Sequence, residues 1–189
     1  MLKHCYQNIP GWFDFQSVYE EAVRDASDGD ILVEVGAWLG KSTAFMAVEI
    51  INSGKRLVFD VIDTWEGNVG EPNTTAPIKN GGTLRALFDA NMKDRGLSGH
   101  CNPITSDSVA AASKYADGSV RFCYIDADHR YETVLADLTA WWPKVAPSGT
   151  LAGHDLRFST VRRAVQEFCA TAGVEFETRD NSWIFRKPS

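Results

Sequence analysis

Short apolar runs that alternate with helix-length segments constrain the fold of this chain more than any other feature. The runs that predict buried strands lie at residues 31–35, 56–62, 102–105, 120–125 and 150–153. Segments with one apolar face at helical spacing lie at residues 15–26, 41–52, 83–95, 131–142 and 160–170. Regular alternation of strands and helices is typical of βαβ units, so we predict an α/β fold with a mostly parallel sheet.

The end of the chain departs from this alternation. Residues 174–178 and 182–186 are strand-like and are joined by the turn residues Arg179-Asp180-Asn181, which predicts an antiparallel closing pair. A length of 189 residues suits one α/β domain, 1–189, in which residues 1–28 form an N-terminal helical extension. Residues 66–82 are rich in Gly, Asn, Pro and Thr and have no periodicity, so we predict a lid loop there.

Composition narrows the partners and the compartment. A net charge of −6 argues against nucleic acid, whose phosphates require a basic surface. The apolar runs are far shorter than the roughly 18 residues of a membrane span, and residues 1–8 lack the apolar segment of a signal peptide. Four widely spaced cysteines form no CxxC pair, so we expect a cytoplasmic protein. A homodimer is compatible with the sequence.

A glycine-rich turn follows the first strand, with the pattern Glu34-x-Gly36-x-x-x-Gly40. Such a turn before a helix presents free N–H groups to a ligand, and glycines let the ligand approach the backbone. Gly40-Lys41-Ser42 resembles the end of a phosphate-binding loop, but the required first glycine would stand at Val35. Glu34 instead suits a cationic ligand. The alternative is that the glycines only form a tight turn.

Polar residues also end the next two strands. Asp63 is placed to accept hydrogen bonds from ribose hydroxyls, and Asp107 or Ser108 to meet an adenine edge, although each also suits a helix cap. Trp38 and Trp65 flank the same predicted crevice and are candidates to stack on adenine or substrate.

The densest polar residues follow the fourth and fifth strands. Asp126, Asp128 and His129 come after the fourth, and His154 and Asp155 after the fifth. If these strands are neighbours, the side chains can together hold a divalent cation, with His129 or Asp128 as general base. The alternative is a set of local roles: a strand-end acid, a helix cap and a hydrogen-bonded pair.

Taken together, these motifs resemble a known family. Residues 33–43 and 61–65 look like the first two motifs of class I methyltransferases that use S-adenosylmethionine (SAM). Residues 125–131, Asp137-Leu138 and 147–155 are similar to a narrower group of small-molecule O-methyltransferases. That group acts on sugar hydroxyls of macrolides and related antibiotics, and the catechol-type enzymes are more distant relatives.

The resemblance implies a Rossmann-like, doubly wound, seven-stranded sheet, mostly parallel with one antiparallel strand, with helices on both faces. It implies SAM contacts at Glu34, Gly36, Trp38, Gly40, Ser42, Asp63, Thr64, Asp107, Ser108 and Asp126. It further implies a cation, Mg²⁺ or Mn²⁺, on Asp126, His154 and Asp155, with a base among His129, Asp128 and His154. Histidine replaces an acid at position 154, which disfavours Mg²⁺.

We therefore expect methyl transfer from SAM to a hydroxyl of a small polar molecule, such as a sugar or natural product. Two alternatives stay open. A non-catalytic SAM-binding protein would share the cofactor motifs, and a nucleotide-cofactor oxidoreductase would share the architecture but require a third glycine in the turn. The sequence does not name the acceptor or distinguish O- from N-methylation.

Overall fold

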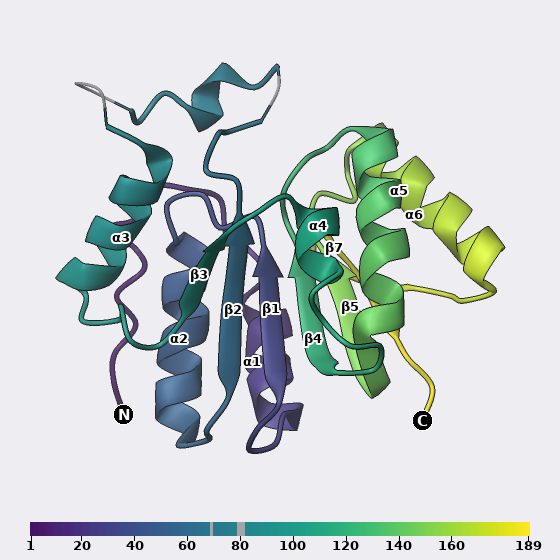
Figure 1. The fold of residues 1–189 in the computed structure, drawn as a ribbon, viewed down its shortest axis with the longest axis horizontal. Coiled ribbons are helices and arrows are strands. Elements are labelled where there is room, and N and C mark those ends of the chain that lie inside the picture. Colours follow the sequence, from purple (N-terminus) through teal and green to yellow (C-terminus); the bar gives the residue numbers. More distant parts are fainter. Residues whose placement is uncertain (69, 79–81) are drawn as a thin grey trace.

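The computed structural model describes residues 1–68, 70–78 and 82–189 and contains one seven-stranded sheet, ordered β3-β2-β1-β4-β5-β7-β6 (Figure 1). The strands are β1 (Ile31–Val35), β2 (Val58–Asp63), β3 (Asn102–Thr105), β4 (Val120–Ile125), β5 (Val145–Gly153), β6 (Glu177–Arg179) and β7 (Ser182–Arg186). The first five pair in parallel, and β7 pairs antiparallel with both β5 and β6. The predicted mostly parallel sheet with one antiparallel strand is confirmed.

Helices cover both faces of the sheet, as predicted. They are α1 (Gln16–Asp25), α2 (Lys41–Ser53), α3 (Leu84–Asp94), α4 (Ser108–Ala112), α5 (Tyr131–Trp141) and α6 (Ser159–Ala172), with short 3-10 turns η1 (Pro72–Thr74) and η2 (Trp142–Lys144). Alternate strand residues serve the two cores: Leu32 packs with α1 and α2, whereas Val33 packs with α5 and α6. Among the described helices, none has the length and apolar character to cross a bilayer.

Two strand boundaries differ from the prediction. β5 begins at Val145 rather than residue 150, because a register shift opposite Val120 and Phe122 accommodates Pro147, which cannot donate to a regular ladder. β6 is shorter than predicted and begins at Glu177 rather than residue 174.

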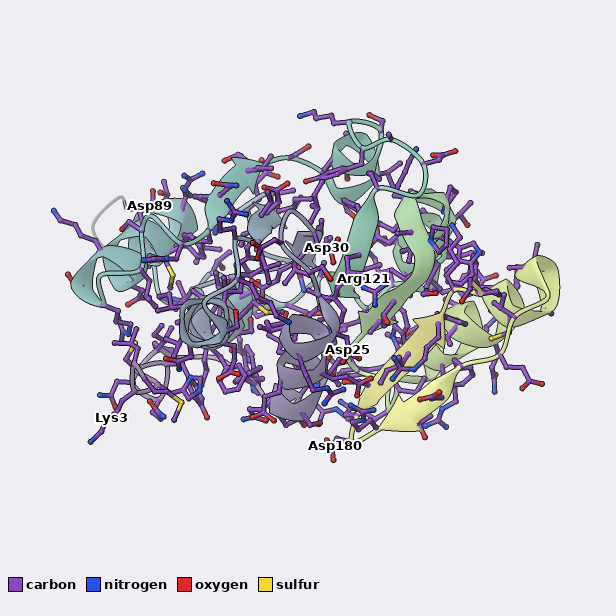
Figure 2. All side chains as sticks on the ribbon, turned by 90° about the horizontal axis from the view of Figure 1, so that it is seen from below. Lys3, Asp25, Asp30, Asp89, Arg121 and Asp180 are labelled. Carbon is purple, nitrogen blue, oxygen red and sulfur yellow. The ribbon has the colours of Figure 1, made fainter. Side chains whose placement is uncertain are left out.

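The strand order reverses between β1 and β4, since β2 and β3 lie on one side of β1 and β4 and β5 on the other. In open α/β sheets such a reversal leaves a crevice at the carboxyl ends of the strands. Figure 2 shows the molecule from the opposite end, where Arg121 Nη2 donates to the carbonyl of Asp25 at 3.2 Å. We therefore expect the ligand site at the carboxyl ends of the strands.

Candidate active site

A cleft of about 940 Å³ lies at the carboxyl ends of β1, β2, β3, β4 and β5. It gathers most of the predicted site residues in one place: Gly36, Trp38, Ser42, Asp63, Thr64, Asp107, Ser108, Asp126, Asp128, His129, His154 and Asp155. Glu34 and Gly40 are not part of its lining. Residues from opposite ends of the sequence thus meet here because parallel strands end at one edge of the sheet.

The two glycines of the turn are required by the protein's own packing. Gly36 has φ 88°, and a Cβ there would lie 2.0 Å from the carbonyl oxygen of Asp126. Gly40 has φ 85°, and a Cβ there would lie 2.9 Å from the Phe88 ring and 2.7 Å from Cε of Met92. The missing side chain of Gly40 therefore makes room for α3, and the expected cofactor contact at Gly40 stays a prediction.

Glu34 is buried between helices α1 and α2. It is 1% exposed, and its carboxylate accepts hydrogen bonds from the Tyr19 hydroxyl at 2.9 Å and from the Thr43 hydroxyl. Burial raises the pKa of this carboxyl to about 7, although hydrogen bonds from Ser42, Thr43 and Tyr19 oppose the rise. The carboxylate is buried with partners on α1 and α2 and does not line the cleft, so the expected contact with the ammonium group of SAM, direct or through water, stays a prediction.

Asp63 fastens the glycine turn to the end of β2. Its Oδ2 accepts from the backbone N–H groups of Ala37 and Trp38, both at 2.8 Å, and its Oδ1 accepts from the N–H of Trp65 at 2.7 Å. Trp38 and Trp65 have φ 47° and 54°, a region unfavourable for bulky residues, so these hydrogen bonds stabilise a strained turn. Asp63 lines the cleft, and Oδ1 retains one lone pair for a ligand hydroxyl.

The two tryptophans of the crevice have different environments. Trp38 lines the cleft and stacks on Trp12 at 5.3 Å between ring centroids, with its Nε1 donating to the carbonyl of Thr74 at 2.6 Å. Trp65 is 5% exposed and packs on Phe88, and it is absent from the cleft lining. The expected stacking role of Trp65 is therefore corrected to a role in the core.

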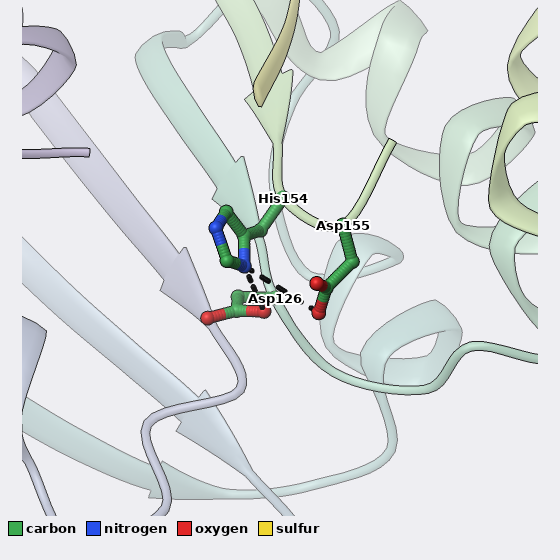
Figure 3. Close-up of side chains that lie close together, drawn as sticks. All are labelled: Asp126, His154 and Asp155. Carbon is green, nitrogen blue, oxygen red and sulfur yellow. Dashed lines mark ion pairs between the residues drawn. The ribbon is translucent and has the colours of Figure 1, made fainter. Parts of the chain in front are cut away.

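Three predicted cation ligands converge at the ends of β4 and β5 (Figure 3). His154 Nδ1 lies 3.5 Å from Asp126 Oδ1 and 3.4 Å from Asp155 Oδ2. One donor atom from each of the three residues falls within 4.8 Å of the others. We call these three residues the polar cluster.

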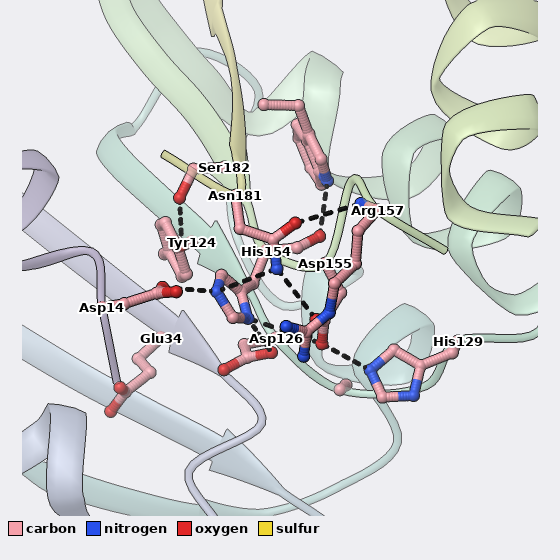
Figure 4. Close-up of polar contacts among 12 residues, drawn as sticks. Asp14, Glu34, Tyr124, Asp126, His129, His154, Asp155, Arg157, Asn181 and Ser182 are labelled. Carbon is pink, nitrogen blue, oxygen red and sulfur yellow. Dashed lines mark hydrogen bonds and ion pairs between the residues drawn. The ribbon is translucent and has the colours of Figure 1, made fainter. Parts of the chain in front are cut away.

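Hydrogen bonds extend the polar cluster on both sides (Figure 4). His154 Nε2 lies 2.7 Å from Asp14 Oδ1, a residue of the N-terminal segment. On the other side, His129 bridges two carboxylates, with Nε2 2.7 Å from Asp155 Oδ2 and Nδ1 2.7 Å from Glu71 Oε1. The result is a chain in which acids and imidazoles alternate across the cleft.

This alternation favours protonated imidazoles. The hydrogen bond to Asp155, assisted by Glu71, raises the pKa of His129 to about 9 against the effect of burial. For His154, burial lowers the pKa, but the hydrogen bonds to Asp126 and Asp155 outweigh it and raise the pKa to about 10. Burial would raise the pKa of Asp155, yet the two histidines hold it well below its usual range.

The donor set of the polar cluster fits a divalent transition ion. Two carboxylates and one imidazole suit Mn²⁺ better than Mg²⁺, which prefers oxygen ligands. His154 Nδ1 is directed at both carboxylates from distances beyond an optimal hydrogen bond, which is compatible with an ion between them. An ion and a proton on Nδ1 would exclude each other.

Asp128 is engaged elsewhere. Its carboxylate accepts from the backbone N–H and from Nε of Arg130, both at 2.7 Å. Burial would raise the pKa of Asp128, but the hydrogen bonds from Arg130 outweigh it and lower the pKa. Asp128 lines the cleft, with Arg130 shielding its charge.

Several site residues were not found from the sequence. Asp14 and Glu71 bind the two histidines, and Trp12 and Phe158 line the cleft while 64% and 41% exposed. Phe158 stacks on His129 at 4.7 Å. The Pro-Gly-Trp-Phe-Asp sequence that carries Trp12 and Asp14 was visible, but nothing in its pattern ties it to a strand end.

The fold and the cleft define a Rossmann-like α/β protein with a ligand site at the switch point of its sheet. A family model described as a methyltransferase domain matches residues 33–156, more than half of the chain, and the chain belongs to that family. It is a class I SAM-dependent methyltransferase, which removes the oxidoreductase alternative. No curated protein matches the chain in sequence.

Solved structures share the fold at low sequence identity. The O-methyltransferase NovP is 19% identical with a TM-score of 0.63, covering 92% of this chain and 79% of its own. An O-methyltransferase from Bacillus cereus, solved with S-adenosylhomocysteine (SAH), is 14% identical with a TM-score of 0.62, covering 96% and 85%. CalS11, a TDP-rhamnose 3'-O-methyltransferase of calicheamicin biosynthesis, is 14% identical with a TM-score of 0.61, covering 90% and 77%.

Proposed function

We propose that this methyltransferase transfers the methyl group of SAM to a hydroxyl on a small ring-containing molecule bound at the polar cluster. The observation that carries the proposal is that the glycine turn after β1 contacts the polar cluster. Gly36 packs against the backbone of Asp126, whose carboxylate faces His154. A cofactor on the turn therefore lies beside groups able to hold an acceptor oxygen.

The cofactor lies across the ends of β1, β2 and β3 in this proposal. The turn from Gly36 to Trp38, with Ser42, receives the methionine portion. Asp63 and Thr64 face the ribose, and Asp107 and Ser108 face the adenine. Asp126 stands between the cofactor and the acceptor.

The chemical step is an in-line displacement. An acceptor oxygen attacks the methyl carbon, the O–CH₃ bond forms as the S–CH₃ bond breaks, and the bonding pair returns to sulfur to give SAH. The hydroxyl proton passes to a base. Most of the acceleration comes from holding oxygen, carbon and sulfur in line, with a smaller contribution from the base.

His129 is the base in our proposal, acting in its neutral form. Of the three candidates, Asp128 is held by Arg130, and the His154 side chain is 4% exposed between carboxylates. His129 also binds two carboxylates, but its side chain is 24% exposed beside Phe158, so an acceptor hydroxyl can replace Glu71 or Asp155 at one ring nitrogen. Its pKa of about 9 predicts a rate that rises as the pH increases towards 9.

Asp126, His154 and Asp155 would hold a divalent cation, with Mn²⁺ the best match to the donor set. Such an ion would lower the pKa of a bound hydroxyl. His154 and Asp155 then orient the acceptor oxygen, and Asp14 fixes the imidazole by holding its Nε2.

The acceptor side of the cleft offers aromatic faces. Trp12 and Phe158 are among the few exposed large apolar side chains of the described residues, and both line this cleft. Both lie close to the polar cluster. Trp12 is two positions from Asp14, which binds His154, and Phe158 stacks on His129, which binds Asp155. A ring stacked on either face would bring its hydroxyl to the cluster, and sugar or natural-product rings meet this requirement.

We also propose that the predicted lid at 66–82 covers the bound substrate. In its described part, Asn68 Nδ2 donates to the carbonyl of Ala127 at 2.8 Å and Glu71 binds His129. Residues 69 and 79–81 lie outside the described residues. Protection of this segment from limited proteolysis on addition of SAH supports the lid, and unchanged cleavage would remove it.

The test is transfer of labelled methyl from SAM to a panel of sugar nucleotides, catechols and amines, with Mn²⁺, Mg²⁺ or EDTA. We expect labelled ethers from hydroxyl acceptors, a loss of about 10²–10⁴-fold in His129→Gln, and full activity in the exposed helix variant Lys93→Ala. Labelling restricted to amines, or equal rates in His129→Gln and the control, would contradict the proposal.

A further inference from the structure

The turn between β6 and β7 lies against the polar cluster, although it is far from β4 and the N-terminal segment in the sequence. β7 runs antiparallel to β5, with Trp183 opposite Gly153, so it begins where the parallel strands end. The indole Nε1 of Trp183 donates to the carbonyl of His154 at 3.1 Å. A Cβ at Gly153 would lie 2.1 Å from the Trp183 ring, so the two strands pack closely here. Asn181, the residue just before β7, is therefore held beside the end of β5.

Asn181 binds three residues of the loop that joins β5 to α6. Its backbone carbonyl accepts from the N–H of Leu156 at 3.0 Å, and its Oδ1 accepts from the N–H of Arg157 at 3.0 Å. Its Nδ2 donates to Asp155 Oδ1 at 3.1 Å (Figure 4). Because a backbone N–H only donates, the amide oxygen must face Arg157 and the NH₂ group must face Asp155. The side chain thus has one orientation, with a donor directed at the carboxylate.

The two oxygens of Asp155 consequently have different partners. Oδ1 accepts from Asn181 and lies 3.3 Å from Nη2 of Arg157. Oδ2 lies 2.7 Å from His129 Nε2 and 3.4 Å from His154 Nδ1. The terminal torsion of an aspartate is soft, so without a partner on Oδ1 either oxygen could turn towards the histidines. Asp155 also has φ 59°, a region that few residues other than glycine adopt and that neighbouring contacts must stabilise.

We propose that Asn181 is a positioning residue of the acceptor side, which holds Asp155 Oδ1 so that Oδ2 alone faces the polar cluster. This inference rests on the proposed function, in which Asp155 holds a cation and orients the acceptor oxygen. A carboxylate that binds an ion is commonly fixed by a hydrogen bond to its other oxygen. The neutral amide supplies that bond without the positive charge that would repel a divalent cation. Asn181 itself is not part of the cleft lining.

Asn181 is better placed for this task than Arg157, the other group near Asp155 Oδ1. The Arg157 side chain is 63% exposed and its contact is 3.3 Å long, so water competes for the guanidinium. The Asn181 amide also lies 3.4 Å from His154 Nε2. When an ion occupies Nδ1 of that ring, the proton is on Nε2 and is directed at Asp14, 2.7 Å away. The amide then serves Asp155 and not the imidazole.

The experiment measures Mn²⁺ affinity by electron paramagnetic resonance titration and SAH affinity by calorimetry. Asn181→Ala and Asn181→Leu both lose the side-chain hydrogen bonds, and Leu keeps the branched shape of Asn. Asp180→Asn is the matched control, because position 180 is exposed in the same turn and asparagine tolerates its φ of 53°. We expect Mn²⁺ affinity to fall about tenfold in both Asn181 variants and to stay within about twofold in the control. SAH affinity should stay within about threefold of wild type in all three.

Asn181→Ala is then combined with Asp155→Ala, because a residue that acts through Asp155 loses its effect when that carboxylate is absent. The double variant should bind Mn²⁺ as Asp155→Ala does, whereas a residue that only supports the loop would weaken binding in both backgrounds. With the acceptor found by labelled methyl transfer, kcat should fall about tenfold in Asn181→Ala while the KM for SAM stays unchanged. If Asn181→Ala fails to fold, Asn181→Leu gives the same comparison.

Unchanged Mn²⁺ affinity and kcat in both Asn181 variants would overturn the proposal, and so would an equal loss in the Asp155→Ala background. A wild type that binds SAH but no Mn²⁺ would contradict the cation, and kcat without metal then gives the same comparison. A wild type without methyl transfer would contradict the proposed function itself. The melting temperatures of the same metal-free variants would then test Asn181, and losses that simply add would overturn its action through Asp155.

Discussion

On the β1–β3 side of the cleft the carboxylates bind backbone amides, whereas on the β4–β5 side Asp126 and Asp155 face imidazole rings and Asp128 binds Arg130. Asp63 accepts from three N–H groups and Asp107 caps α4. Asp126 and Asp155 instead face His154, and Asp155 also binds His129. Backbone amides do not titrate or bind metals, and imidazoles do both. The cofactor side is thus fixed in shape, while the acceptor side depends on protons and ions.

The two sides also differ in how far along the chain their partners lie. Asp63 binds residues of the turn that follows the neighbouring strand and a residue two positions away. The acceptor side joins β5 to the N-terminal segment through His154 and Asp14, and β4 to the 66–78 segment through His129 and Glu71. Changes on the first side should therefore damage structure and cofactor binding together, and changes on the second should separate catalysis from cofactor binding.

The largest effect is expected from Asp63→Ala. The change leaves the N–H groups of Ala37, Trp38 and Trp65 without their acceptor and releases two residues held at positive φ. We expect a loss of about 2–5 kcal/mol in unfolding free energy and at least a hundredfold weaker SAH binding, measured by thermal denaturation and calorimetry. Asp60→Ala, on the same strand but outside the cleft, is the control; equal SAH affinity in the two variants would contradict the role of Asp63.

A smaller and more selective effect is expected from Asp155→Ala. The change removes one ligand of the polar cluster and one partner of His129, but it leaves the glycine turn untouched. Mn²⁺ affinity, measured by electron paramagnetic resonance titration, should fall about 10–100-fold. SAH affinity should stay within about threefold of wild type. If SAH binding fell as far as in Asp63→Ala, the separation of the two sides would be wrong.

This division also explains what the sequence could predict. The glycine turn, the position of Asp63 and the polar residues after β4 and β5 follow from local strand–helix alternation, because parallel strands deliver their ends to one edge. The buried partners of Glu34 do not follow, because Tyr19 and Thr43 approach from two helices whose packing no local pattern specifies. For the same reason Asp14, 140 positions from His154, could not be assigned to the site.

The smallest effect is a pH dependence that belongs to the acceptor side. The pKa values of His129 and His154 are raised to about 9 and 10, so the stability they contribute is fully present below about pH 6.5 and is lost as the pH rises through those values. Glu34 and Asp137, whose pKa values are raised to about 7, contribute stability at low pH that is mostly lost by about pH 7.5. Above pH 7.5 the loss comes from the histidines and, above about pH 8.5, also from Cys101 and Cys123, since burial raises the pKa of both thiols.

We expect the melting temperature of the metal-free protein to fall between pH 7.5 and 9.5 by about 2–4 °C for each kcal/mol lost. His129→Gln should reduce this slope, because it removes one of the two groups. Lys93→Ala, on the surface of α3, should leave it unchanged. Saturating Mn²⁺ should flatten the curve further, since an ion on His154 Nδ1 replaces the proton there. A wild-type curve as flat as that of His129→Gln would mean that the His129 imidazole is neutral in the folded protein and does not make the acceptor side sensitive to protons.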